Sequence, residues 1–130
     1  MKKNKKKILI VEDDQFLMSL LKLKLSARAF TVLTAIDAKE AFAVLEKEQV
    51  ACVLLDLLLP GVDGFSVLEQ LRDSERFKSI PVIVVSNLGA AEEKKKALGL
   101  GARSFLIKAE NSPESIVKKV EEIIGEGIIE

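Results

Sequence analysis

The sequence contains no histidine and a single cysteine, Cys52, among its 130 residues. Without histidine, the chain can form neither a Ser-His-Asp catalytic triad nor an imidazole metal site. One cysteine excludes an internal disulfide and a cysteine-based metal cluster, and its place in an apolar run is typical of a small core residue. Any site must therefore use carboxylates, hydroxyls, amides and lysines, and we expect a reducing, cytoplasmic compartment.

Long apolar runs are also absent, because no segment approaches the ~20 residues that a membrane-spanning helix needs. The basic start resembles the first part of a signal peptide, but the apolar run that follows, residues 8–11, is short and ends in acidic residues. We therefore expect no membrane partner. Residues 1–6 are predicted to form a basic, flexible tail.

An excess of basic charge is lacking as well, since 20 Lys and Arg are balanced by 20 Asp and Glu. Five of the lysines fall in the first seven residues, so the remainder carries 15 basic and 20 acidic residues. Phosphate contacts require a concentrated basic face, and the composition argues against direct binding to nucleic acid. The length and the 48% hydrophobic content suit one compact domain over residues 1–130.

What the sequence does contain is five short apolar runs that alternate with longer amphipathic segments. Continuous runs of this kind suit strands that are buried on both faces, as in a parallel sheet. The runs lie at residues 8–11, 30–35, 51–55, 82–85 and 104–107. The alternation predicts an α/β, doubly wound fold of the flavodoxin-like type, with a five-stranded parallel sheet in the order 2-1-3-4-5 and five helices on both faces.

The helices carry their own signals. Asp37 and Glu40 have the spacing of a capping box, and Ser112 followed by proline marks the start of the fifth helix. The third helix is predicted from about residue 64, the fourth over about 90–98, and residues 125–130 are predicted to be a C-terminal tail. The expected buried face of the first helix consists of Leu17, Leu20, Leu21 and Leu25.

Polar residues end four of the five predicted strands. Glu12, Asp13 and Asp14 follow the first, Asp56 the third, Ser86 the fourth and Lys108 the fifth. In open α/β sheets, ligands bind outside the carboxyl ends of the strands, where the strand order reverses. The first and third strands are neighbours at that point, so the carboxylates of Glu12, Asp13 and Asp56 should converge.

Three carboxylates in one place repel one another, and a hard divalent cation with oxygen ligands, Mg²⁺ (or Mn²⁺), would relieve that repulsion. Mg²⁺ often completes its shell with phosphate oxygens. Lys108 and the Ser86 hydroxyl could hold the other oxygens of a phosphoryl group, and a carboxylate such as Asp56 can be the nucleophile that forms an aspartyl phosphate.

Taken together, these motifs resemble the response-regulator receiver domain of bacterial two-component signalling, and the resemblance covers essentially the whole chain. It rests on residues 8–14 (ILIVEDD), residues 56–64 (DLLLPGVDG), Ser86, residues 101–102 (GA) and Lys108. The resemblance implies that Asp56 is the phospho-acceptor. It further implies that Asp13 binds the metal directly, that Glu12 acts largely through water, and that the backbone carbonyl of Leu58 is a further metal ligand.

The resemblance also assigns the switch and the partners. Ser86 would contact the phosphoryl group and move on activation, Lys108 would pair with that group, and Phe105 occupies the aromatic switch position. A sensor histidine kinase, a phosphotransfer protein or a small phosphodonor would phosphorylate Asp56. The face formed by the fourth helix, fifth strand and fifth helix would then control a downstream protein target or homodimer. The chain would be a signalling domain and not an enzyme.

Four positions bear on how closely the chain follows the family pattern. Ala109 stands after Lys108, where the family usually has a cis proline, so either the site supports a costly cis bond or the loop differs. Phe105 has no hydroxyl where tyrosine is common, and it can respond only by repacking. Leu58 and Leu88 occupy the two positions that tune hydrolysis of the acyl phosphate, and neither can orient water, so we expect slow dephosphorylation.

Three alternative functions share some of these features. A haloacid-dehalogenase-like phosphatase uses a similar set of residues, but it usually has a second Asp where this chain has Leu58. A flavin-binding module would need a phosphate-cradling loop after the first strand, and the acidic loop here would repel phosphate. A receiver-like interaction domain that is not phosphorylated is the third alternative, and the complete acidic set argues against it.

Overall fold

The computed structural model describes residues 5–126. Its main feature is a parallel sheet in the order β2-β1-β3-β6-β7, with all four pairings parallel. Counted along the chain without the small β4–β5 hairpin described below, this is the predicted order 2-1-3-4-5. The strands are β1 (Lys7–Val11), β2 (Thr31–Ala35), β3 (Cys52–Leu55), β6 (Val82–Ser86) and β7 (Ser104–Ile107).

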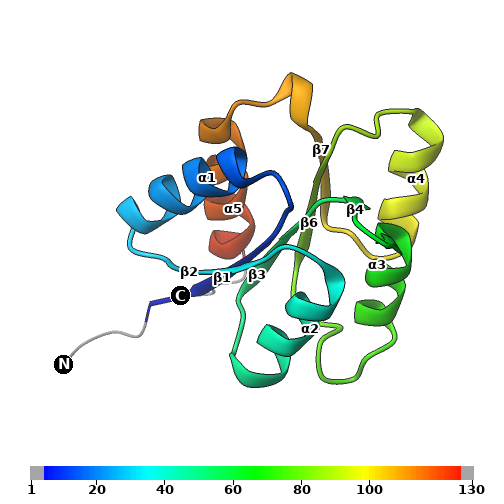
Figure 1. Ribbon diagram of the computed structural model, residues 1–130, viewed down its shortest axis with the longest axis horizontal. Coiled ribbons are helices and arrows are strands. Elements are labelled where there is room, and N and C mark those ends of the chain that lie inside the picture. Colours follow the sequence, from blue (N-terminus) through cyan, green and yellow to red (C-terminus); the bar gives the residue numbers. More distant parts are fainter. Residues whose placement is uncertain (1–4, 127–130) are drawn as a thin grey trace.

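Helices cover both faces of the sheet, as predicted (Figure 1). Helices α1 and α5 lie on one face, and α2, α3 and α4 lie on the other. Alternate strand residues therefore enter two separate cores, with Leu9 and Val11 in one and Ile8 and Ile10 in the other. The helices are α1 (Gln15–Ala27), α2 (Ala38–Lys47), α3 (Gly64–Arg72), α4 (Ala91–Gly99) and α5 (Pro113–Glu126).

Aspartates begin three of these helices. The carboxylates of Asp14, Asp37 and Asp63 accept backbone N–H groups of the first turns of α1, α2 and α3. The predicted capping box at Asp37 is half right, because Glu40 accepts from the N–H of Ile36 (2.9 Å) and not from Asp37. The cap predicted at Ser112 is confirmed, since its hydroxyl accepts the N–H of Ser115.

Two details of the predicted helices were wrong in part. The buried face of α1 consists of Met18, Leu21 and Leu25, whereas Leu17 and Leu20 are only partly buried. The sequence of α1 is apolar on two sides, so its pattern does not single out the inner face. The C-terminal tail was predicted from residue 125, but α5 continues to Glu126. The predicted tails otherwise extend into residues 1–4 and 127–130, which lie outside the described residues.

A short antiparallel hairpin, β4 (Leu58–Leu59) and β5 (Val62–Asp63), follows β3 and was not predicted. Gly61 turns the hairpin with a φ of 71°, which favours glycine. At Gly64, a Cβ atom would lie 2.4 Å from the Cα atom of Leu57, so only glycine allows α3 to start this close to the loop after β3. The hairpin and the close contact of Gly64 with Leu57 therefore hold the loop after β3, the central strand, in one conformation.

Cys52 offers a test of this packing. The side chain is fully buried, and burial raises the pKa of its thiol to about 12 from an ordinary value of 9.0. We expect no reaction with an aromatic disulfide reagent at pH 8 in the native protein, and rapid reaction in denaturant. Rapid labelling of the native protein would contradict the described core.

The same shift has a consequence for stability. Below about pH 9 the thiol is protonated in both the folded and the unfolded chain, so its ionisation has no effect on the free energy of unfolding. As the pH rises from about 9 to 12, the thiol ionises only in the unfolded chain, and the wild type loses stability. A Cys52→Ala variant should be less stable than the wild type by about 1 kcal/mol at pH 7. This difference in the free energy of unfolding, measured by urea titration, should therefore shrink between about pH 9 and 12.

Candidate functional site

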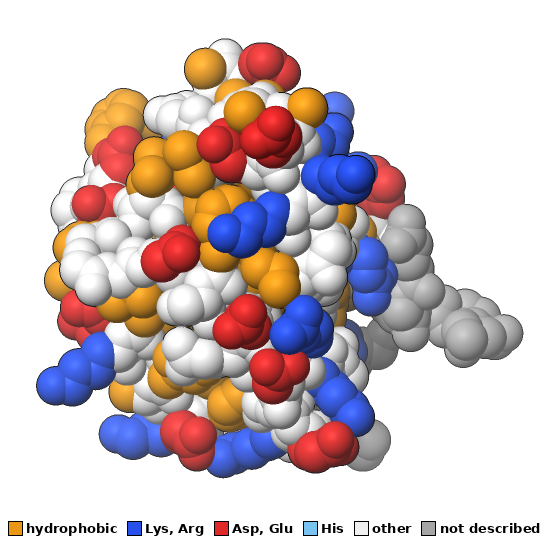
Figure 2. Space-filling view, turned by 90° about the vertical axis from the view of Figure 1, so that its right-hand side faces the viewer, with side chains coloured by type: hydrophobic (Ala, Val, Ile, Leu, Met, Phe, Trp, Pro, Cys, Tyr) orange, Lys and Arg blue, Asp and Glu red, His pale blue; other side chains and the backbone are white. Residues whose placement is uncertain are grey.

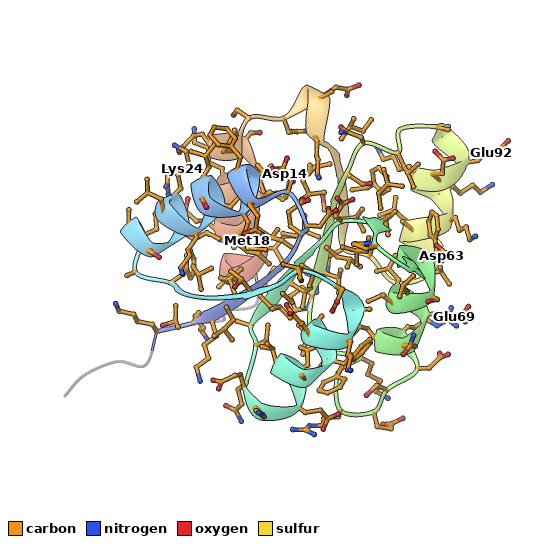
Figure 3. The ribbon with its side chains drawn as sticks, viewed as in Figure 1. Asp14, Met18, Lys24, Asp63, Glu69 and Glu92 are labelled. Carbon is orange, nitrogen blue, oxygen red and sulfur yellow. The ribbon has the colours of Figure 1, made fainter. Side chains whose placement is uncertain are left out.

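The carboxyl ends of four parallel strands meet at one edge of the sheet and carry the predicted residues. Glu12 and Asp13 follow β1, Asp56 follows β3, Ser86 ends β6 and Lys108 follows β7. Figure 3 labels Asp14 at the start of α1 and Asp63 at the start of α3, which lie on either side of this edge. The sheet therefore gathers these residues from distant parts of the chain.

Lys108 is the centre of the site. Its ammonium nitrogen lies 2.8 Å from Glu12 Oε1 and 2.8 Å from Asp56 Oδ2. Since β6 lies between β3 and β7 in the sheet, the lysine side chain spans that strand to reach both carboxylates. One cation thus connects the ends of β1, β3 and β7.

The second oxygen of each carboxylate accepts a backbone N–H group. Glu12 Oε2 accepts from Asp14 at 3.0 Å, and Asp56 Oδ1 accepts from Leu58 at 2.9 Å. Both carboxylates are therefore held by two contacts, one to Lys108 and one to the loop that follows their own strand. Charge-assisted bonds of this kind fix the orientation of a buried carboxylate.

Burial makes the charges of this site costly. Glu12 is 3% exposed and Asp56 is 4% exposed, so neither carboxylate is well hydrated. Burial raises the pKa of Glu12 above its ordinary value, although the bonds from Lys108 and Asp14 oppose that effect. Burial alone would lower the pKa of Lys108, but its bonds to Asp56 and Glu12 outweigh this and the pKa is raised. The site thus holds two buried carboxylates against one ammonium.

Asp13 adds a third carboxylate to the group. It is exposed, and one oxygen from each of Glu12, Asp13 and Asp56 can be chosen so that all three lie within 4.8 Å of one another. Three oxygen donors, two on buried residues and one on an exposed residue, with excess negative charge form a set that fits a hard divalent cation. Of the residues predicted from the sequence, these three and Lys108 are brought together directly.

The predicted switch residues surround this group. The Ser86 side chain is fully buried, and its hydroxyl lies 3.4 Å from the backbone nitrogen of Leu88, a long hydrogen bond to the loop after β6. Phe105 is 7% exposed and packs in the core beside Val84, its register partner on β6. Leu88 is partly buried against the same core, whereas Leu58 is 51% exposed. A metal contact from the Leu58 carbonyl stays a prediction.

The loop at Ala109 differs from the expected family pattern. No cis peptide bond occurs among residues 5–126, so the Lys108–Ala109 bond is trans. Lys108 instead begins a short 3-10 helix, η1 (Lys108–Glu110), and the Asn111 side chain donates to the carbonyl of Ile107 at 3.0 Å. Of the two possibilities left by the sequence, the different loop is the one observed.

An exposed apolar stripe on α1 was not predicted as a functional feature. Phe16 is 76% exposed and Leu23 is 69% exposed. They are seven residues apart and lie on the side of α1 opposite Met18, Leu21 and Leu25. The spacing of Phe16, Leu20 and Leu23 could have signalled a second apolar face. The stripe begins two residues after Asp14 and therefore borders the acidic group.

Within the described part of the chain, none of the helices has the length and hydropathy to cross a membrane.

Comparison with known proteins gives consistent results. The family model of the response regulator receiver domain matches residues 8–121. The chain is 35% identical over 102 residues to the response regulator PleD of Caulobacter vibrioides, covering 78% of this chain and 22% of PleD. It is 33% identical over 112 residues to the DNA-binding dual master transcriptional regulator RpaA of Synechocystis, covering 86% of this chain and 46% of RpaA. The chain spans about half or less of these relatives.

Solved structures resemble the chain over nearly its full length. A CheY-like receiver domain protein from Methanospirillum hungatei superimposes with a TM-score of 0.86 and 28% identity, covering 95% of this chain and 96% of that one. The phosphorylated cyanobacterial phytochrome response regulator RcpA superimposes with a TM-score of 0.85 and 28% identity, covering 97% of this chain and 98% of that one. The Mn²⁺-bound form of response regulator Rcp1 superimposes with a TM-score of 0.78 and 27% identity, covering 91% of each chain. These similarities confirm the predicted fold.

The acidic group yields a prediction about metal. Mg²⁺ at one hundred times its Kd should raise the free energy of unfolding by about 2–3 kcal/mol, because the cation binds the folded chain. Asp13→Asn should remove most of that rise. Asp14→Asn is a matched control, since asparagine caps α1 equally well and Asp14 lies outside the group.

Thermal denaturation in EDTA and in Mg²⁺ provides the measurement. An equal effect of Mg²⁺ on the wild type and on Asp13→Asn would show that the cation does not bind at this group.

Proposed function

The chain belongs to the response regulator receiver family, and we propose that it works in two-component signalling by accepting a phosphoryl group on Asp56 in a reaction that depends on Mg²⁺ or Mn²⁺. The observation that carries the proposal is the environment of Asp56. Its carboxylate is buried at a strand end, is held by Lys108 and the Leu58 amide, and lies beside Glu12 and Asp13.

Asp56 is fixed but retains reactive electron pairs. Each carboxylate oxygen has two lone pairs, and one hydrogen bond to each leaves a lone pair free. One oxygen would bond to phosphorus while the bond from phosphorus to the donor's leaving group breaks, and the leaving group keeps that electron pair. The hydrogen bonds hold the carboxylate in one orientation, which lowers the entropic cost of the reaction.

Lys108 would support the charge before and after transfer. Once Asp56 becomes an acyl phosphate, its carboxyl group no longer carries the charge that the lysine neutralised. The negative charge then lies on the phosphoryl oxygens, and the flexible lysine side chain can follow it while keeping its bond to Glu12. A cation held by Glu12, Asp13 and Asp56 would neutralise further charge on the phosphoryl group when bound.

Ser86 provides a route from the site to the next loop. The hydroxyl now accepts from the Leu88 N–H at the long distance of 3.4 Å, a weak bond that the serine can give up when its O–H donates to a phosphoryl oxygen. Rotation of the side chain toward a phosphoryl oxygen would release that N–H group and free the loop between β6 and α4. Phe105, which pairs with Val84 on the adjacent strand, would repack in response.

The output surface would be the face of α4, β7 and α5. Figure 2 shows the side of the molecule that carries α4, where hydrophobic side chains lie among acidic and basic ones. Leu98 on α4 is 41% exposed. A mixed surface of this kind suits a reversible contact with a downstream protein or a second copy. A DNA-binding role would belong to a whole relative such as RpaA, and we propose no direct contact between this domain and nucleic acid.

A phosphodonor protein would dock on the exposed stripe of α1. Phe16 and Leu23 present apolar surface that begins next to the acidic group, where a donor must approach. Two alternative functions are less well supported: a phosphatase would need an acid at position 58, where this chain has Leu58, and flavin binding would need a phosphate-binding loop where it has Glu12 and Asp13. A receiver-like domain without phosphorylation remains the alternative that the next experiment decides.

The proposal predicts the outcome of incubation with acetyl phosphate. In the presence of Mg²⁺, the intact mass of the protein should increase by one phosphoryl group, and EDTA should prevent the increase. Asp56→Asn should gain nothing, because the amide is not a nucleophile, while Asp63→Asn should react like the wild type because Asp63 only caps α3.

If the mass of the wild type does not increase, or if the mass of Asp56→Asn increases equally, the proposed role of Asp56 is contradicted.

The lifetime of the acyl phosphate is a separate prediction. Leu58 and Leu88 offer no hydrogen bond to water, so the phosphoryl group should survive for many minutes or longer. Leu58→Asn should shorten that lifetime about tenfold or more by orienting water, whereas Leu58→Met should leave it unchanged. Loss of the added mass can be followed by mass spectrometry after removal of the phosphodonor. A wild-type lifetime of seconds would show that other groups activate water.

A further inference from the structure

The outer edge of β2 is a surface that the proposed function does not use. β2 lies at one end of the sheet, and within residues 5–126 it pairs only with β1 (Figure 1). The seven residues 30–36 (FTVLTAI) contain no charge, proline or glycine. Windows with these properties and high β-propensity associate readily when they are exposed at an edge, and proteins usually protect such edges with charge, proline or a bulge.

The two edges of the sheet differ in this respect. The opposite edge strand, β7, has a charged residue at each end, Arg103 and Lys108. β2 is instead preceded by Phe30, which is partly buried, and followed by Ile36, which is 42% exposed. The β2 edge therefore lacks the usual protection, and a partner strand that covers it would bury apolar surface.

The hydrogen bonds of β2 show which backbone groups face outward. The N–H of Thr31 donates to the carbonyl of Lys6 at 2.9 Å, and the carbonyl of Ala35 accepts from Glu12 at 3.0 Å. In a parallel pair, alternate residues direct both backbone groups to the neighbouring strand. Residues 31, 33 and 35 therefore face β1, and Val32 and Thr34 direct their N–H and carbonyl groups away from the sheet.

We propose that the β2 edge pairs with β2 of a second copy of this chain, antiparallel and around a two-fold axis at Leu33. Val32 then lies opposite Thr34 of the second copy, and Thr34 opposite its Val32. Each of these two pairs exchanges two backbone hydrogen bonds, giving four in all, and Leu33 forms the non-hydrogen-bonded pair at the axis. The two sheets join into one sheet, and since each copy has one such edge, the assembly closes as a dimer.

Charge favours the antiparallel direction. At the amino end of β2, exposed Lys6 precedes the neighbouring strand β1. Asp37, Lys39 and Glu40 follow the carboxyl end of β2, where acidic residues outnumber basic ones. Antiparallel pairing brings the basic end of one copy near the acidic end of the other, and a parallel arrangement would bring like charges together. The side chains of Leu33 and Val44 are only partly buried against the core beneath α2, so apolar surface remains on them for contact with the second copy.

Cross-linking tests the two-fold axis. In a Leu33→Cys variant of the full chain, the two introduced thiols face each other in a non-hydrogen-bonded pair, whose Cα separation of about 4.5 Å lies within the range for disulfides. Mild oxidation should produce a covalent dimer. Thr34→Cys is the matched control, because position 34 faces position 32 of the other copy and should cross-link at least about tenfold more slowly. Cys52 is buried and should not interfere.

Sedimentation equilibrium tests the backbone pairing without a cross-link. Strand pairing alone is a small contact, so we expect a Kd of about 10–100 μM. Thr34→Pro removes an outward N–H that the native sheet does not use, and it should weaken the dimer at least about tenfold. Thr34→Val keeps that N–H and should stay within about twofold of the wild type. Asp56→Asn should dimerise normally, since the pairing does not depend on phosphorylation.

Several results would overturn the proposal. The wild type could remain monomeric up to millimolar concentration, Thr34→Pro could dimerise as tightly as the wild type, or the cysteines at positions 33 and 34 could cross-link at equal rates. A dimer that survives Thr34→Pro would indicate that another face is used. If Thr34→Pro does not fold by circular dichroism, the comparison of the two cysteine variants decides alone.

Discussion

The ion pairs of Lys108 with Glu12 and Asp56 are the interaction on which the site depends. They connect the ends of three strands, and they place two buried carboxylates within 2.8 Å of one ammonium group. Removing one partner of a buried pair typically costs about 3–5 kcal/mol, because the remaining charge is left without compensation. The same arrangement leaves the site with more negative than positive charge once Asp13 is included, and that excess is the physical reason why we propose a divalent cation beside it.

The fold makes this arrangement possible by aligning strand ends. Parallel pairing brings Val11 opposite Leu55, so Glu12 and Asp56 emerge side by side, and Ser86 opposite Ile107, so Lys108 emerges next to Ser86. The loops then complete the site with backbone groups: the N–H groups of Asp14 and Leu58 bind the carboxylates. Tight packing of Gly64 against Leu57 holds the second of these loops in place. Stability and the proposed function thus depend on the same few residues at the carboxyl ends of the strands.

The sequence was sufficient to predict the five strands, their order and the gathering of Glu12, Asp13, Asp56 and Lys108, because buried parallel strands have strong apolar runs and the strand order decides which ends meet. It was less informative where several conformations satisfy the same pattern. Helix α1 is apolar on two sides, so Leu20 was assigned to the core in place of Met18. The β4–β5 hairpin and the 3-10 turn after Lys108 depend on loop packing, which no periodic pattern encodes. The direction of the Ser86 hydroxyl depends on a neighbouring N–H group that only the folded chain places.

The central claim is that Asp56, and no other carboxylate of this acidic group, carries the phosphoryl group. Borohydride reduces an acyl phosphate to an alcohol, which would convert a phosphorylated aspartate to homoserine and leave free carboxylates unchanged. Peptide mapping of the reduced protein measures this directly. We predict homoserine at position 56 alone. Homoserine at position 13 or 14 in place of position 56, or a phosphorylated protein that yields none, would contradict it.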